Sequence, residues 1–355
     1  MKGKAENAGR LLIRADAGSR MGTGHVMRCL ALAQAWQAAG GTVLFVEAQA
    51  VPALDERLRG EGMEIAHLPP VVLGSGEDAA ATAVLAQQFN AQWIVIDGYH
   101  FGAAYQKQLK EAGFRLLFVD DNGHADHYYA DLVLNQNIHA EAALYQRREP
   151  YTRLLLGTSY ALLRREFWPW RGWRREIPER ARRILVTLGG SDPDNVTLKV
   201  IRVLQRLDDE GLEAVVVVGG SNPHYDSLMT AIAEGPAAIQ LRHNVTNMPE
   251  LMAWADLAIS AGGSTCWELA FMGLPNLILI LADNQEMIAR QLDMAGVANN
   301  LGWFHNVTEK TLRQELIRLT TFNREGMSQR GYDLIDGWGG QRVVSAITNN
   351  VVPLT

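Results

Sequence analysis

Short apolar segments alternate with longer amphipathic segments along most of the chain. In the first half, runs rich in valine, isoleucine and leucine occupy residues 11–13, 43–46, 93–96, 116–119 and 132–134. A second series occupies residues 184–188, 214–218, 239–241, 257–260 and 277–281. Spacers of helix length separate the runs, which is typical of β-α units in parallel sheets. The pattern therefore predicts an α/β fold built from two series of parallel strands.

The two series are separated by FWPWRGWRREIPERARR, residues 167–183, which has no clean period. A chain of 355 residues that is 48% hydrophobic also exceeds the usual size of one core. We predict an amino-terminal domain over residues 1–175, a second over 176–335, and a final helix within 336–355 that crosses back to the first. The basic and aromatic separator either docks an anionic membrane or partner, or is an interdomain linker, which is the simpler interpretation.

Charge and cysteine content narrow the class of protein. The formal net charge of −6 provides no global cationic field for nucleic acid, which we therefore do not expect as a partner. Two isolated cysteines form neither a disulfide framework nor a zinc cluster. The polar first ten residues and the lack of an apolar run near ~20 residues predict a cytoplasmic protein without membrane insertion. Nothing in the sequence indicates an oligomeric state.

A glycine-histidine turn, Gly22-Thr23-Gly24-His25, lies between the first strand and a helix expected from Val26. Gly22 and Gly24 allow positive φ and let a ligand approach the backbone, while first-turn N–H groups favour an anion. The turn therefore cradles a phosphate, presents His25 as a base, or only reverses the chain with a capping histidine. A helix start disfavours the imidazolium form, which favours His25 as a general base.

A dinucleotide site is a weaker interpretation of the same turn. Gly22-x-Gly24 follows a strand, and Glu47 ends the next one where a ribose-binding acid belongs. The third glycine of that fingerprint is replaced by Met27, whose side chain obstructs close helix–strand packing. We therefore expect no nicotinamide cofactor.

An anion site is predicted in the second half. Gly262, Gly263, Ser264 and Thr265 follow a strand and precede a helix expected from Cys266. Their N–H groups and hydroxyls suit phosphate, and Glu268 suits ribose hydroxyls. An ordinary capping box from Ser264 or Thr265 to Glu268 is the alternative.

Two further loops carry polar candidates. Gly190 and Ser191 repeat the strand–glycine–polar arrangement, and we interpret the following Asp192 and Asp194 as helix caps rather than metal ligands. Asn284 and Gln285 follow the strand at 277–281, where an open α/β sheet presents groups to ligands. A simple polar loop is the alternative for that pair.

Taken together, these segments resemble the UDP-2,4-diacetamido-2,4,6-trideoxy-β-L-altropyranose hydrolases of bacterial pseudaminic acid biosynthesis. The resemblance covers most of the chain and includes RADAGSRMGTGHVMRCLALA, VIDGY, LLLGTSYALLRREF, LVTLGGSDPDN, NMPELMAWADLAISAGGSTCWELAFMGLP, ADNQ and DGWGGQRVV. YALLRxEF and RADA discriminate best, because glycine turns recur across glycosyltransferases of the same fold. The resemblance implies a GT-B fold, in which two Rossmann-like domains with parallel sheets face a cleft.

The resemblance also implies an activity and residue roles. Water attacks the anomeric carbon of a UDP-sugar, UDP leaves with inversion, and neither a metal nor a cofactor takes part. His25 matches the catalytic base, Tyr99 and Arg164 match residues near the sugar, and Asn284 matches a substrate-binding amide. Glu268 matches the ribose-contacting acid, and Met248 ends the loop whose backbone meets uracil. For Arg164, a surface ion pair with Glu166 is the alternative.

Two other functions use the same residues. An inverting GT-B glycosyltransferase replaces water by an acceptor hydroxyl and turns over only when that acceptor is present. A nucleotide-sugar sensor binds tightly without turnover, but an exposed histidine at a helix start argues against it.

Overall fold

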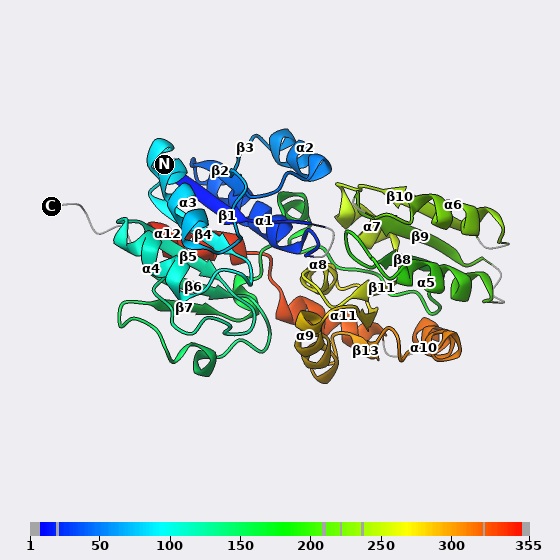
Figure 1. Cartoon of the computed structure of the whole chain (residues 1–355). Coiled ribbons are helices and arrows are strands. Elements are labelled where there is room, and N and C mark those ends of the chain that lie inside the picture. Colours follow the sequence, from blue (N-terminus) through cyan, green and yellow to red (C-terminus); the bar gives the residue numbers. More distant parts are fainter. Residues whose placement is uncertain are drawn as a thin grey trace. The chain divides into compact units, whose positions relative to one another are not determined.

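The computed structural model describes residues 8–18, 21–207, 211–220, 222–235, 238–321 and 324–349. The chain divides into two compact units. Unit 1 comprises Met1–Arg165 and Gly337–Thr355, and unit 2 comprises Glu166–Asp336 (Figure 1). The division falls before the predicted boundary at residue 175, so the Trp- and Arg-rich segment belongs to unit 2.

Within its described residues, unit 1 forms a seven-stranded sheet in the order β3-β2-β1-β4-β5-β6-β7, with every pair parallel. The strands are β1 (Arg10–Ala15), β2 (Thr42–Glu47), β3 (Glu64–His67), β4 (Trp93–Asp97), β5 (Arg115–Val119), β6 (Leu132–Asn135) and β7 (Arg153–Leu156). The helices are α1 (Gly24–Ala38), α2 (Pro52–Gly60), α3 (Gly76–Gln88), α4 (Ala103–Glu111) and α12 (Gly339–Thr348), with short 3-10 turns η1 (Ala142–Tyr145) and η2 (Thr158–Tyr160). Continuous apolar strands result because helices cover both faces of a parallel sheet.

Unit 2 repeats this plan with a described six-stranded parallel sheet in the order β10-β9-β8-β11-β12-β13. The strands are β8 (Arg183–Thr187), β9 (Glu213–Val218), β10 (Ala238–His243), β11 (Leu257–Ala261), β12 (Asn276–Ile280) and β13 (Asn299–Trp303). The helices are α5 (Val196–Gln205), α6 (Tyr225–Ala233), α7 (Met248–Trp254), α8 (Thr265–Phe271), α9 (Asp283–Met294), α10 (Glu309–Thr321) and α11 (Arg324–Leu334); the turn η3 (Arg165–Trp170) begins at the boundary of the units.

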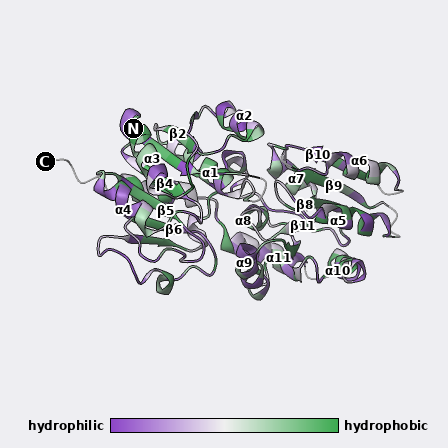
Figure 2. Ribbon diagram, in the orientation of Figure 1, coloured by the Kyte–Doolittle hydropathy of each residue, from purple (hydrophilic) through white to green (hydrophobic). Residues whose placement is uncertain are grey.

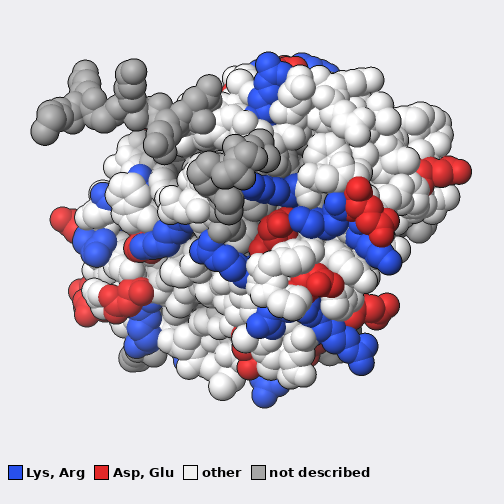
Figure 3. All heavy atoms as spheres, turned by 90° about the vertical axis from the view of Figure 1, so that its left-hand side faces the viewer, with Lys and Arg blue, Asp and Glu red and all other residues white. Residues whose placement is uncertain are grey.

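Hydropathy follows these layers. The strands are mostly hydrophobic, whereas the helices carry hydrophilic residues on part of their surface (Figure 2). Trp36 and Trp93 are among the largest fully buried side chains of unit 1. On the face shown in Figure 3, basic and acidic residues are interspersed. None of the described helices combines the length and the apolar character that crossing a membrane requires.

The last helix, α12, packs against α1 in unit 1. Its first residues are glycines for a steric reason: a Cβ on Gly339 would lie 2.2 Å from the carbonyl oxygen of Ala161. A Cβ on Gly340 would lie 3.1 Å from the Cβ of Ala35 on α1. The glycines of GWGGQ therefore allow the carboxyl-terminal helix to approach this unit closely.

Each sheet has a point where the strand order reverses. In unit 1 it lies between β1 and β4, and in unit 2 between β8 and β11. Ligands of open α/β sheets bind at the carboxyl ends of the strands at such points. The Gly22–His25 turn follows β1, while the turns that hold Gly190 and Gly263 follow β8 and β11. The fold thus places the predicted turns where ligand sites form.

Candidate active site

The turn before α1 is held by its own backbone. Gly18 N donates to Gly22 O at 3.1 Å, and Gly22 N donates to Gly18 O at 2.7 Å. Gly22 has a φ of 75°, and an added Cβ on Gly22 or Gly24 would meet nothing within 4 Å. The Gly22 N–H is therefore already bonded within the turn and is not available to a phosphate. The helix begins at Gly24, not at the predicted Val26, so His25 is its second residue.

The side chain of His25 faces the end of β4. Its Nδ1 lies 2.7 Å from Oδ1 of Asp97, and the two residues are 7% and 0% exposed. Asp97 is adjacent to Ala15 in the register of β4 and β1, which brings it beside the turn. Nη2 of Arg28 lies farther from Nδ1, at 3.2 Å. Because a carboxylate only accepts hydrogen bonds, the shorter contact favours the neutral form with the proton on Nδ1, in which Nε2 keeps its lone pair. Asp97 was not among the residues predicted from the sequence.

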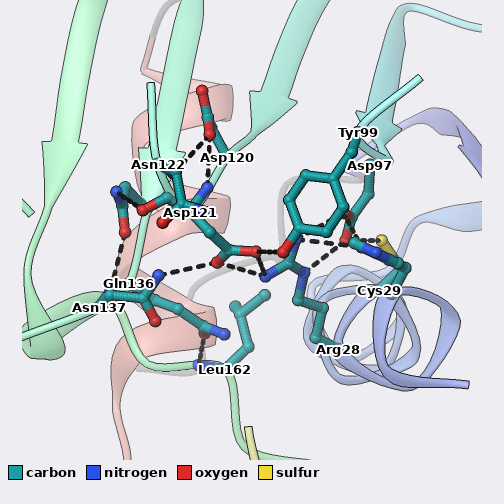
Figure 4. Close-up of polar contacts among 12 residues, drawn as sticks. Arg28, Cys29, Asp97, Tyr99, Asp120, Asp121, Asn122, Gln136, Asn137 and Leu162 are labelled. Atoms are coloured by element: carbon teal, nitrogen blue, oxygen red, sulfur yellow. Dashed lines mark hydrogen bonds and ion pairs between the residues drawn. The ribbon is translucent and has the colours of Figure 1, made fainter. Parts of the chain in front are cut away.

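Arg28, one turn after His25 on α1, connects two carboxylates (Figure 4). Its Nε donates to Oδ2 of Asp97 at 2.6 Å, and its Nη1 donates to Oδ1 of Asp121 at 2.7 Å. Cys29 donates its thiol to Oδ2 of Asp97 at 3.3 Å. Since the arginine and both aspartates are buried, Asp97 is held in one orientation by a charged donor as well as by His25.

Tyr99 is the exposed member of this network. Its hydroxyl donates to Oδ2 of Asp121 at 2.7 Å, and its ring lies edge-on to His25 with centroids 5.0 Å apart. Asn137, which follows β6, donates to Oδ1 of Asp121 at 2.8 Å. Tyr99 is 39% exposed. The structure thus brings the predicted pair, His25 and Tyr99, together at the surface of a buried ionic network.

The charges of this network lower the pKa values of both of its carboxyl groups. Burial by itself raises the pKa of Asp97, but Arg28 and then His25 hold it well below its usual range. Burial also raises the pKa of Asp121, and Arg28 outweighs this effect, with a further lowering by Tyr99. Both carboxyl groups therefore remain ionised at neutral pH.

These shifts predict a pH-dependent stability. A folded-state pKa below the unfolded value of about 3.9 gives stability that is present above that value and is lost as the pH falls through the folded-state pKa. Asp121→Asn should destabilise unit 1 at pH 7 by about 1.5–3 kcal/mol, the range for hydrogen bonds to charged groups. The difference from the parent protein should shrink towards pH 3, as measured by urea unfolding with hydrogen exchange of α1. Asp126→Asn, at an exposed position, is the control; a gap independent of pH would contradict the prediction.

Arg164 is only 8% exposed and is therefore not a surface residue, whatever its partners. The segment around it is fixed to unit 1 by two glutamines. Leu162 N donates to Oε1 of Gln136 at 2.8 Å, and Arg165 N donates to Oε1 of Gln34 at 2.7 Å. The role of Arg164 near a sugar stays a prediction.

In unit 2, Gln285 joins two turns. Its Oε1 accepts from Gly262 N at 3.1 Å and from Leu281 N at 3.0 Å. A Cβ on Gly262 would lie 2.9 Å from the Cβ of Gln285, which explains the first glycine of the pair by packing. The acceptor oxygen of Gln285 is therefore engaged within the protein, and its amide N–H groups are the part suited to a ligand.

The second glycine has no such packing reason. A Cβ on Gly263 would meet nothing within 4 Å. Ser264 is the N-cap of α8, yet its side chain makes no capping hydrogen bond, so the capping-box interpretation lacks its serine half. Helix α8 begins at Thr265 and carries Glu268 in its first turn. Open space at Gly263 and an uncommitted capping hydroxyl leave this turn suited to an anion.

The remaining candidates lie on neighbouring loops. Asn284 is exposed in the first turn of α9 and not in a loop, while Met248 is the buried first residue of α7. Gly190 follows β8 and packs against the turn after β9, because a Cβ on Gly219 in that turn would lie 2.4 Å from Gly190 O. Beyond Ser191, Asp192 accepts from Val196 N at 2.9 Å and from Thr197 N at 2.8 Å. Asp192 is thus a helix cap, as the sequence analysis expected.

Comparisons with known proteins agree with this arrangement. The glycosyltransferase family 28 C-terminal domain matches residues 183–330, which lie in unit 2. The structure is similar to that of MurG from Acinetobacter baumannii, with a TM-score of 0.66 at 18% identity over 96% of this chain and 99% of that one. The chain has the GT-B fold. This finding confirms the predicted fold class of two Rossmann-like units with parallel sheets.

Two relatives align over both units. The UDP-2,4-diacetamido-2,4,6-trideoxy-beta-L-altropyranose hydrolase of Campylobacter jejuni is 26% identical over 290 residues, covering 81% of this chain and 97% of the relative. An uncharacterized protein of Methanocaldococcus jannaschii, MJ1062, is 26% identical over 279 residues, or 76% of this chain. This chain spans only 55% of the length of MJ1062. The comparison with the hydrolase confirms the resemblance inferred from the sequence motifs.

Proposed function

We propose that this protein hydrolyses UDP-2,4-diacetamido-2,4,6-trideoxy-β-L-altropyranose, or a close UDP-diamino sugar, to free sugar and UDP in pseudaminic acid biosynthesis. The observation that carries this proposal is the His25–Asp97 contact at the carboxyl edge of the unit 1 sheet. It leaves Nε2 of His25 as a proton acceptor beside the partly exposed ring of Tyr99. A fixed imidazole with a free lone pair is suited to activate water.

Each unit would contribute its own groups to the reaction. Cleavage of the anomeric C–O bond leaves negative charge on the diphosphate and positive character on the sugar, so donors are needed at the leaving group. In unit 2, Gly263, Ser264 and Thr265, with Gly190 and Ser191, would supply N–H groups and hydroxyls. In unit 1, Nε2 of His25 would take a proton from water as its oxygen bonds to the anomeric carbon. UDP would depart with the bonding electron pair and without a metal ion.

The other candidates would contact the nucleotide and the sugar. Glu268 would accept from ribose hydroxyls, the backbone at Met248 would meet uracil, and Asn284 with the amide N–H groups of Gln285 would bind the sugar. Tyr99 and Arg164 would line the sugar side. We expect these contacts to operate in the cytoplasm on a freely diffusing UDP-sugar.

A glycosyltransferase is the second candidate, because the family model that matches unit 2 is a glycosyltransferase domain. The alignment with the hydrolase favours hydrolysis. It spans 290 residues, more than either unit contains, whereas the glycosyltransferase domain match ends within unit 2. The similarity to the hydrolase thus extends to the unit that holds the proposed base.

Hydrolysis in H₂¹⁸O tests the proposal. With the UDP-sugar, EDTA and no acceptor, we expect UDP release with ¹⁸O at the anomeric oxygen of the sugar, because water attacks carbon. Mass spectrometry of both products and NMR of the first-formed anomer measure the label and the inversion. Label in UDP would show attack on phosphorus and overturn the mechanism. Turnover only with an added acceptor would favour the transferase, and tight binding without turnover would favour a sensor.

A further inference from the structure

A second polar cluster lies in unit 1, on the β2-α2-β3 segment. Glu47 is the last residue of β2, His67 is the last residue of β3, and the two are direct neighbours in the register of these strands. Asp55 extends from α2, the helix that connects the strands. Nε2 of His67 lies 3.2 Å from Oδ2 of Asp55 and 3.9 Å from Oε2 of Glu47. One β-α-β unit thus gathers one imidazole and two carboxylates.

Glu47 lacks the partners that a buried carboxylate requires. Its side chain is 0% exposed, and neither of its oxygens has a hydrogen-bond partner among the described residues. Oδ1 of Asp55, which is 5% exposed, also has none among them. A buried carboxylate without a donor is costly, so such groups are usually paired or bound to a metal. The burial of Glu47 also excludes it as the ribose-binding acid considered for a dinucleotide site.

We infer that Glu47, Asp55 and His67 bind one divalent transition-metal ion, with Zn²⁺ as the best match. Their ligand atoms lie within 4.8 Å of one another. Zn²⁺ at 2.0–2.2 Å from nitrogen and carboxylate ligands separates them by roughly 3.2–3.6 Å, so small side-chain rotations suffice. One imidazole with two carboxylates favours Zn²⁺ over Mg²⁺ or Ca²⁺, which prefer all-oxygen sites.

The local charge balance supports a cation. The buried guanidinium of Arg14 forms its ion pairs with Asp16 and Asp78, which lie outside this cluster. The guanidinium of Arg59 also lies 3.3 Å from Oδ2 of Asp55. Because the Arg59 side chain is 59% exposed, it offsets little of the negative charge of the cluster. The side chain of His67 is 33% exposed, which gives an ion a route from solvent.

The expected role of this ion is structural. It would join α2 and the edge strand β3 to β2, away from the His25–Asp97 pair. The inference is therefore independent of the proposed hydrolysis, and its test uses stability and spectroscopy instead of activity.

The test uses the full chain, freed of metals with EDTA, dialysed and without an affinity tag. Zn²⁺ at about 100 times its dissociation constant should raise the unfolding temperature by roughly 5–10 °C, from the linkage relation and the size of the unit. Titration calorimetry should give one Zn²⁺ per chain. Co²⁺ should give the visible absorption bands of a low-symmetry site with nitrogen and oxygen ligands.

Two variants and a matched control decide the outcome. Glu47→Gln and His67→Gln should each abolish the Zn²⁺-induced shift and the Co²⁺ bands, while circular dichroism in EDTA verifies that they fold. His127→Gln removes the histidine of another His–acid pair in the same unit, with Glu149 at 2.9 Å, and should keep both signals. No response in the parent protein, or equal responses in all variants, would overturn the site. The site would also be overturned if Glu47→Gln raised the unfolding temperature of the metal-free protein while the parent protein showed no response to Zn²⁺. That result would indicate a protonated carboxyl pair.

Discussion

Replacing His25 by asparagine should lower the kcat for UDP release by about 10²–10⁴-fold, the usual contribution of a general base. Asparagine removes the Nε2 lone pair and keeps a polar side chain at the same helix start. The affinity for UDP should not change, because the proposed diphosphate donors lie in unit 2. Single-turnover kinetics and UDP titration calorimetry measure the two effects separately.

The control for His25→Asn is His127→Asn. His127 pairs with Glu149 in the same unit, and its side chain is 32% exposed. Full activity is expected for this variant. If His25→Asn kept near-parent kcat, another group would have to activate the water. Loss of UDP affinity in parallel with kcat would instead indicate a defect of binding or folding.

Replacing Asp97 by asparagine should lower kcat by about 10²–10⁴-fold, although Asp97 itself is a positioning residue. Asparagine offers an N–H₂ group as well as an oxygen, so it can donate to Nδ1 of His25 or accept from it and no longer favours the Nδ1-protonated tautomer. ¹⁵N NMR of the histidine rings should show a mixture of tautomers in the variant and mainly the Nδ1–H form in the parent. A purely structural role would not produce this change.

Stability must be measured beside the activity of Asp97→Asn, because Arg28 loses one of its two buried carboxylates. Asp121→Asn provides the comparison: it removes the other carboxylate of Arg28 and leaves the Asp97–His25 contact in place. If both variants lost kcat equally with unchanged tautomers, the loss would result from destabilisation. A larger loss in Asp97→Asn, with the tautomer change, would support the positioning role.

The strands show what periodicity predicts well. All ten predicted runs overlap described strands. The strands β3, β7 and β13, which were missed, all lie at sheet edges. An edge strand is covered less completely, and EIAH and NNLGW therefore lack a continuous apolar run, whereas RLLL of β7 has only a short one. For β3 and β13, the position at the sheet edge thus explains why periodicity missed them.

The candidate site was predicted in part. The glycine turn and His25 were visible because glycines and a histidine interrupt a strand–helix pattern. Asp97 ends the apolar strand β4 in VIDGY, and Asp121 is the second residue after β5 in FVDDN; an acid at either place also suits a loop. Their association with Arg28 depends on β4 lying beside β1, with β5 next to it. This order is a property of the folded sheet, although acids at several carboxyl strand ends were an available signal.

The two bonds at Gln285 restrict the chemistry that this position tolerates. A glutamate at this position would accept from Gly262 N and Leu281 N equally well, because the side chains of glutamate and glutamine have the same length and both end in an acceptor oxygen. It would also add a negative charge beside a turn proposed to bind a doubly charged leaving group. At about 5 Å and an effective dielectric constant near 20, that repulsion is on the order of 3 kcal/mol for each unit of phosphate charge. A neutral amide organises both turns and leaves the electrostatic potential of the anion site unaltered.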